Sequence, residues 1–267
     1  MYSRLAAVTI RLARVASLFV AVVFAPVSPA TVYPYDVADL WWSEAESGWG
    51  VQMIQQHGTV FATLYVYRAD TTTDFYVAVL APATGLAWSG PVYHTSGPWY
   101  GGAWNPAQVA ETPVGTMSFE AKGYGTGELK YTIGATSVAK NLTRMSIAND
   151  HIGGTFVGAG RVIAADAPCT ATGPVPVVTQ FNHTGGQTVS GTMTTPAGTY
   201  TFNGSYTQVG RYGFIDATYT STQGETGTVV FGWVAVTAFT VTFQYQFDAT
   251  GPSYSCGYWG AFAGTVS

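Results

Sequence analysis

The feature that most constrains this chain is the strict alternation of side chains along many short segments. In the segment 59–67, every second residue (Val60, Ala62, Leu64 and Val66) is aliphatic, and the residues between them are aromatic or polar. A period of two places successive side chains on opposite faces of a β-strand. No segment beyond the N-terminal region has the 3.6-residue spacing of a helix longer than two turns. The sequence therefore predicts an all-β protein.

Segments of this kind follow one another along the chain, separated mostly by short turns with Gly and Pro. The first half contains the strand candidates 51–56, 59–67, 74–80, 87–95, 115–121, 127–133 and 138–145. The second half contains the strand candidates 155–163, 175–181, 188–194, 199–207, 212–220, 227–236, 240–247 and 254–265. Such a succession predicts antiparallel meanders, each curled into a β-barrel or a sandwich. The pattern pauses near residue 148, which predicts two domains, 31–148 and 149–267.

The composition narrows the classes of protein and of partner. Charged residues make up 9% of the chain, against about 25% in ordinary domains, and hydrophobic residues make up 47%. This excludes a disordered chain, which needs low hydrophobicity and high charge. A net charge of −4 without a cluster of Lys and Arg excludes a phosphate-binding surface for nucleic acid. The expected partner is an uncharged small molecule or a glycan.

The N-terminal region has the three parts of a secretory signal peptide. Arg4, Arg11 and Arg14 occur without any acid, and an uncharged run, Val15–Ala25, follows them. The run is shorter than the roughly 20 residues that span a bilayer. Small residues then precede a cleavage site after Ala30, which predicts removal of residues 1–30 and a secreted or periplasmic protein without stable membrane insertion. The alternative is a retained membrane anchor.

The two cysteines, Cys169 and Cys256, agree with export. An even number of cysteines in an oxidising compartment predicts a disulfide, and two free buried thiols are the alternative. We expect no metal site on them, because no histidine lies at ligand spacing. No cofactor is expected either, because the glycine-rich motifs that hold phosphates are absent from the sequence.

A motif near the start of the first domain resembles a known module. Trp41-Trp42, followed by Glu46-Ser47-Gly48-Trp49-Gly50, resembles the opening of an uncharacterised β-rich module of secreted bacterial proteins. Three further segments fit the same module, 61–63, 89–99 and 142–144. The resemblance covers about residues 39–145 and departs from the pattern at Ser43-Glu44-Ala45. It implies secretion and a β-rich module, and it implies no catalytic residue.

Aromatic and amide side chains of the first half predict a binding surface for an uncharged ligand. Their rings can stack on apolar faces of a ligand, and their polar atoms can form hydrogen bonds with it. The candidates are Trp41, Trp42, Trp49, Gln55, Tyr65, Tyr76, Trp99, Tyr100 and Trp104. Trp99, Tyr100 and Trp104 lie on the long connection 96–113. We expect their rings either to form an exposed platform for a ligand or to fold back and plug the end of the barrel. The second face of the strands, which carries Tyr65, either lines a cavity or packs against the C-terminal half.

Signatures of catalysis are few. There is no serine nucleophile elbow and no zinc-binding His-Glu-x-x-His motif. The weak catalytic candidates are Glu44, Glu46, His57 and His94, and the carboxylates that could face them are Asp74, Glu120 and Glu128. The sequence therefore favours a non-catalytic extracellular binding module. The alternatives are a secreted hydrolase of polysaccharides or esters and a structural or adhesive envelope protein.

Overall fold

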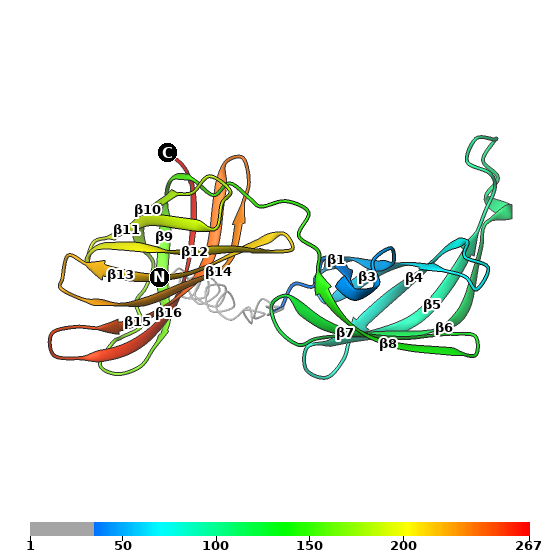
Figure 1. The fold of residues 1–267 in the computed structure, drawn as a ribbon, viewed down its shortest axis with the longest axis horizontal. Coiled ribbons are helices and arrows are strands. Elements are labelled where there is room, and N and C mark those ends of the chain that lie inside the picture. The colour runs from blue at the N-terminus through cyan, green and yellow to red at the C-terminus, as the bar shows by residue number, and fades with distance from the viewer. Residues whose placement is uncertain (1–34) are drawn as a thin grey trace, which may run out of the picture. The chain divides into compact units, whose positions relative to one another are not determined.

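Two closed antiparallel β-barrels follow each other along the chain in the computed structural model, which describes residues 35–267 (Figure 1). Each barrel has eight strands in meander order, so the predicted all-β fold of two antiparallel meanders is confirmed, and both are barrels. The predicted signal peptide lies outside the described residues. Helical structure between residues 35 and 267 is limited to two single turns, η2 (Glu44–Glu46) and η3 (Pro106–Gln108). No helix in this part of the chain is long and apolar enough to cross a membrane.

The N-terminal barrel is closed by a strand that the alternation pattern did not predict. Its strands are β1 (Asp39–Trp42), β2 (Gly50–Gln56), β3 (Thr59–Tyr67), β4 (Thr73–Pro82), β5 (Ala87–Ser96), β6 (Ala110–Ala121), β7 (Thr126–Ile133) and β8 (Thr136–Arg144). The short β1 pairs with both β2 and β8. The Trp41-Trp42 motif thus supplies the strand that completes the hydrogen-bonded ring, in which no strand edge is left open.

The interior of this barrel is built from the aliphatic positions of the alternating segments. Val60, Ala62 and Leu64 on β3 are wholly buried. Trp41 is also 0% exposed, and its ring centroid lies 4.8 Å from that of Phe119 on β6. The neighbouring positions on β3 face outward, because successive side chains of a strand point to opposite faces. The second face of the N-terminal strands is therefore the outer surface of a barrel and lines no lumen.

The C-terminal barrel is closed by its first strand. Its strands are β9 (Gly154–Ala165), β10 (Val175–Asn182), β11 (Thr188–Thr195), β12 (Gly198–Val209), β13 (Tyr212–Ser221), β14 (Thr226–Val236), β15 (Thr240–Thr250) and β16 (Ser255–Val266). Strand β9 pairs with β10 on one side and with β16 on the other. Buried phenylalanines dominate the core, namely Phe156, Phe181, Phe202, Phe231, Phe243, Phe247 and Phe262.

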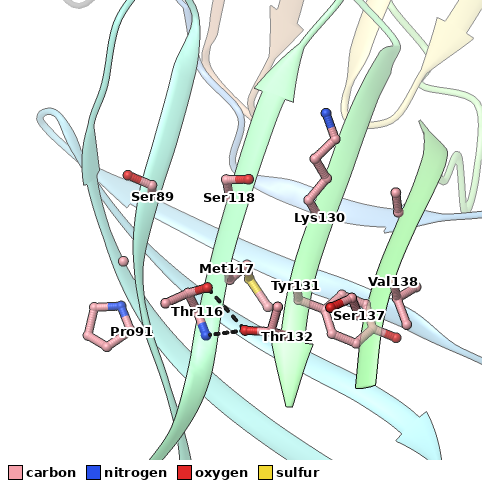
Figure 2. Close-up of a pocket in the computed structure, with 12 residues that line it drawn as sticks. Ser89, Pro91, Thr116, Met117, Ser118, Lys130, Tyr131, Thr132, Ser137 and Val138 are labelled. Atoms are coloured by element: carbon pink, nitrogen blue, oxygen red, sulfur yellow. Dashed lines mark hydrogen bonds between the residues drawn. The ribbon is translucent and has the colours of Figure 1, made fainter. Parts of the chain in front are cut away.

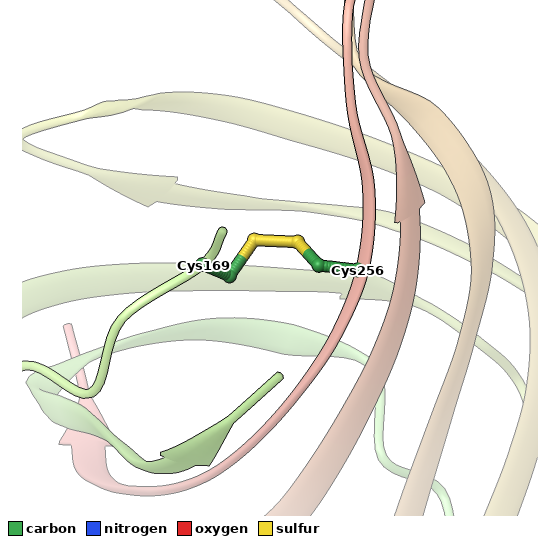
Figure 3. The surroundings of a disulfide bond; sticks show 2 residues. All are labelled: Cys169 and Cys256. Carbon is green, nitrogen blue, oxygen red and sulfur yellow. A yellow bond between two sulfur atoms is a disulfide. The ribbon is translucent and has the colours of Figure 1, made fainter. Parts of the chain in front are cut away.

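One end of the C-terminal barrel carries four of its connections. Since neighbouring strands are antiparallel, the connections β9–β10, β11–β12, β13–β14 and β15–β16 all lie at the same end. We call this end the barrel mouth. A disulfide joins Cys169, in the long β9–β10 connection, to Cys256 in β16, with the Cα atoms 6.0 Å apart (Figure 3). The predicted disulfide is confirmed, and it ties the longest connection of the mouth to the barrel wall.

Candidate functional site

Two of the predicted ligand-binding residues have structural roles. Trp41 has no exposed surface, and its indole N–H donates a hydrogen bond of 2.9 Å to the carbonyl oxygen of Val37. The prediction that Trp41 contacts a ligand is therefore wrong, because the ring fills the barrel core. The amide oxygen of Gln55 accepts a hydrogen bond from the N–H of Val37, and its amide nitrogen donates to the carbonyl oxygens of Tyr35 and His57. Gln55 thus fixes the chain where it enters the barrel.

Four other candidates are spread over the N-terminal barrel. Trp42 and Trp49 are half-buried, and the indole N–H of Trp49 donates to the carboxylate of Glu46 at 3.1 Å. Tyr65 is exposed on the outer face of β3. Tyr76 is half-buried and packs against the barrel core. These side chains do not converge on a cavity.

The remaining three aromatic candidates share one exposed connection. The segment 97–109 joins β5 to β6 and projects from the N-terminal barrel (Figure 1). Trp99 is 71% exposed, Tyr100 is 94% exposed and Trp104 is 69% exposed. The ring centroids of Trp99 and Tyr100 lie 5.9 Å apart, and the segment contains no charged residue. The rings do not fold back over the barrel, so the plug alternative is wrong and a platform is available.

Three of the weak catalytic candidates lie on the open surface. Glu44 and Glu46 belong to the exposed turn η2, and His57 is exposed in the turn between β2 and β3. The carboxylate of Glu46 forms an ion pair of 2.6 Å with Lys140, and this hydrogen bond lowers the pKa of Glu46. Glu120 and Glu128, which were expected to face these residues, form ion pairs with Lys122 and Lys130. These side chains do not form a catalytic cleft.

His94 belongs to a cluster around the buried carboxylate of Asp74. Arg68 Nε donates to Asp74 at 2.7 Å, the Tyr76 hydroxyl donates at 2.9 Å, and His94 Nε2 lies 3.2 Å away. Burial alone would raise the pKa of Asp74, but these hydrogen bonds and one from the Phe75 N–H outweigh it and lower the pKa to about 2. Within residues 35–267, no hydroxyl or thiol is hydrogen-bonded to His94. The cluster therefore stabilises an ionised aspartate and lacks a nucleophile.

A shallow groove crosses the outer face of strands β5–β8. It has a volume of about 690 Å³, and five of its twelve lining residues are serines or threonines (Figure 2). Ser89 and Ser118 are cross-strand partners, as are Thr116 and Thr132, whose hydroxyls lie 3.1 Å apart. The groove presents no exposed aromatic ring and no acid. It lacks the enclosing walls that give a small-molecule site its affinity.

The barrel mouth of the C-terminal domain contains a deeper cavity of about 340 Å³. Its aromatic wall consists of Tyr200, Tyr245, Tyr254 and Tyr258, and its apolar wall consists of Val162, Val177 and Met193. Residues of all four mouth connections contribute to the lining, among them Thr170, Ala197, Glu225 and Tyr254. The cavity therefore depends on closure of the whole barrel and on the disulfide-anchored β9–β10 connection.

The polar groups of this cavity are buried and incompletely paired. Glu225 is 5% exposed, and the hydroxyl of Tyr258, which lines the cavity, finds no hydrogen-bond partner among the described residues; Tyr219 lies behind the lining, next to Glu225. Burial raises the pKa of both tyrosines. Burial also raises the pKa of Tyr245 to about 12, although the hydroxyl of Tyr245 donates to the carbonyl oxygen of Arg161 at 2.9 Å. Since most buried polar groups in proteins are hydrogen-bonded, unpartnered groups beside a cavity mark a site for a ligand.

The position of Glu225 inside the barrel could not be predicted from the sequence. It lies in the turn Gln223-Gly224-Glu225, and turns usually expose their charges to solvent. Gly224 has a φ of +77°, which favours glycine, and the chain then turns Glu225 toward the barrel interior. The available signal was the tyrosines at inward-facing strand positions, such as Tyr219, Tyr245 and Tyr258.

Residues 35–267 contain no group of three or more His, Cys, Asp or Glu side chains that could hold a metal ion.

Comparisons with known proteins do not assign a function to this chain. No protein-family model matches the chain, and no curated protein matches it. Among solved structures, a protein of unknown function from the DUF3598 family of Nostoc punctiforme is similar at 8% identity and a TM-score of 0.23. The match covers 85% of this chain and 93% of that chain, and at this TM-score it says nothing about function.

Proposed function

We propose that this chain is a non-catalytic binding protein that holds a small organic ligand in the mouth of its C-terminal barrel. The observation that carries the proposal is the cavity of about 340 Å³, whose lining includes the buried acid Glu225 and the unpartnered hydroxyl of Tyr258. A ligand that pairs with these groups removes the free-energy cost of burying them alone.

The architecture supports such a role. The interior of an eight-stranded barrel is just wide enough to hold one small ligand. Small-molecule sites of about 300–1,000 Å³ combine mostly apolar walls with a few polar groups that fix orientation. The residues that line this cavity include one carboxylic acid and no histidine. This composition favours binding over general acid–base catalysis.

Export to the periplasm or the cell exterior is part of the proposal. The disulfide between Cys169 and Cys256 supports it, because such bonds persist in oxidising compartments. The predicted signal peptide and the resemblance of residues 39–145 to a secreted module point the same way.

The methyl group of Met193 offers a direct test. The chain has five methionines, of which Met193 lines the cavity, whereas Met53 and Met117 lie in the core of the N-terminal barrel. In a titration of the ¹³C-methyl-methionine protein with a library of small charged and neutral fragments, we expect shifts of Met193 and unchanged Met53 and Met117. If no fragment shifts Met193, the proposal fails.

A matched pair of variants locates the site. Ala197→Trp places a bulky ring at an exposed turn of the mouth, and Ala238→Trp places the same ring at an exposed turn of the opposite end. We expect Ala197→Trp to weaken fragment binding by about tenfold or more, the equivalent of one lost favourable contact. Ala238→Trp should retain binding, and equal losses in both variants would contradict the assignment.

The exposed ring platform favours a second candidate function, glycan binding. Trp99, Tyr100 and Trp104 are presented together on an uncharged projecting connection. Aromatic faces attract the C–H groups of sugar rings, and the side chain of Asn105 lies in the same segment. This surface fits the neutral partners that the low charge of the chain predicts.

A glycan array followed by a titration of intrinsic tryptophan fluorescence tests this second function. We expect a glycan that shifts the fluorescence of the wild-type protein and binds about tenfold more weakly to Trp99→Ala and to Trp104→Ala. Ala197→Trp, at the barrel mouth, should leave glycan binding unchanged. The absence of any glycan-induced shift would contradict a platform for sugars.

A further inference from the structure

We infer that the ligand of the barrel mouth carries a protonated amine, which the carboxylate of Glu225 and the surrounding tyrosines receive. This inference rests on the proposed function, because it names the chemical class of the ligand for the same cavity. It departs from the composition, which predicts uncharged partners for the chain as a whole.

Glu225 presents a buried carboxyl without a counterion. The backbone N–H of Glu225 donates to Ser221 Oγ at 3.1 Å, and its carbonyl oxygen accepts from the Ser221 N–H at 2.8 Å. Its carboxyl oxygens form no ion pair with any residue between 35 and 267, and the polar side chain beside them is the neutral hydroxyl of Tyr219. Burial raises the pKa of Glu225, and the nearby Tyr219 hydroxyl opposes that shift. Because a buried charge requires a partner, a cation from the ligand is the missing complement.

No basic side chain among the residues that line the cavity points into it. Arg161 is the one basic residue of the lining. It is exposed on β9 between the inward-facing Gly160 and Val162, so the alternation of the strand directs its side chain outward. It contributes its main chain, whose carbonyl oxygen accepts the Tyr245 hydroxyl. The inward-facing charge of the cavity is therefore purely acidic.

The aromatic wall of the cavity is suited to a cation. Tyr200 and Tyr258 both pack against Phe247, at centroid distances of 5.5 Å and 5.1 Å, which holds their rings in place. A ring face attracts a cation that is withdrawn from water. The unpartnered hydroxyl of Tyr258 and the carboxylate of Glu225 can accept N–H groups, so a primary ammonium, which has three N–H donors, suits this set better than a fully methylated one.

The test compares two ligands that differ in charge and little in shape. 2-Phenylethylamine and 2-phenylethanol are titrated into the full chain at neutral pH by calorimetry, with the Met193 methyl signal as the site-specific readout. We expect the amine to bind about tenfold to a hundredfold more tightly, the range for a charged hydrogen bond. Tetramethylammonium should bind more weakly than the amine, and a preference for it would overturn the role of the N–H donors.

The variant Glu225→Gln keeps the shape of the side chain and removes its charge. We expect this variant to lose the preference for the amine over the alcohol, whereas Glu111→Gln, an exposed site on β6, should keep it. Should Glu225→Gln fail to fold, the comparison of the two ligands in the wild-type protein still decides. Equal affinity of amine and alcohol, with Met193 shifting, overturns the amine inference and leaves the proposed function standing. If no fragment of either charge shifts Met193, both fail.

Discussion

Replacing Cys169 and Cys256 together by serine is expected to lower the free energy of unfolding of the C-terminal barrel by roughly 4–5 kcal/mol. The two cysteines are 87 residues apart in sequence, and the loop that they close contains strands β10–β15. In the chain-entropy model, a cross-link over so long a loop removes much of the freedom of the unfolded chain. Urea unfolding followed by far-UV circular dichroism measures the difference.

Reduction of the wild-type protein provides the control for this prediction. Reduced wild-type protein should unfold at the same urea concentration as the double serine variant, because both lack only the cross-link. The Met193 methyl signal should also broaden or shift, since the disulfide anchors the β9–β10 connection beside the cavity. A loss below about 1 kcal/mol would mean that the barrel wall alone constrains this connection.

The strands of the C-terminal barrel could be predicted because each strand of a barrel wall has one buried face and one exposed face. Apolar and polar side chains therefore alternate along its sequence. On β15, Val241, Phe243, Tyr245 and Phe247 are buried and the residues between them face outward. Strand β1 escaped prediction because it has four residues, too few for a period of two to be recognised. Its Trp41-Trp42 pair consists of one inward and one outward ring, which a sequence shows merely as two adjacent apolar residues.

The cavity could not be predicted for a different reason. Met193, Tyr200, Glu225 and Tyr258 come from separate strands and turns, and they meet because the meander closes on itself. Alternation assigns a face to a side chain, but it does not reveal which end of the barrel is left unfilled. The exposure of Trp99 was likewise undecided by sequence, because an aromatic connection can project or fold back with equal ease. In the structure, the connection between β5 and β6 projects from the barrel (Figure 1), and Trp99 is exposed.

The low charge of the chain has a more specific meaning in the structure than in the sequence. Three acids of the N-terminal barrel, Glu46, Glu120 and Glu128, are paired with lysines at the surface. Glu225 has no such partner and is withdrawn from water. A surface that attracts neutral molecules is thus compatible with one interior site that selects a charge, because selectivity depends on the local environment of a single group.

The two tryptophans Trp41 and Trp99 provide the second large expected effect. Both were candidates for ligand contact, yet Trp41 is 0% exposed and Trp99 is 71% exposed. Trp41→Ala is expected to lower the free energy of unfolding by about 3–5 kcal/mol, because it opens a cavity in the core and removes the hydrogen bond to Val37. Trp99→Ala should change it by no more than about 0.5 kcal/mol, because its ring is largely in solvent.

Chemical unfolding followed by far-UV circular dichroism measures both changes without depending on tryptophan fluorescence. The guanidinium carbon of Arg144 lies 4.7 Å from the centroid of the Trp41 ring, so Trp41→Ala also removes the support beneath a buried arginine. A small effect of Trp41→Ala would mean that the β1 strand does not close the barrel in solution. A large effect of Trp99→Ala would mean that its ring packs onto the protein, and the platform proposed for glycans would then be unavailable.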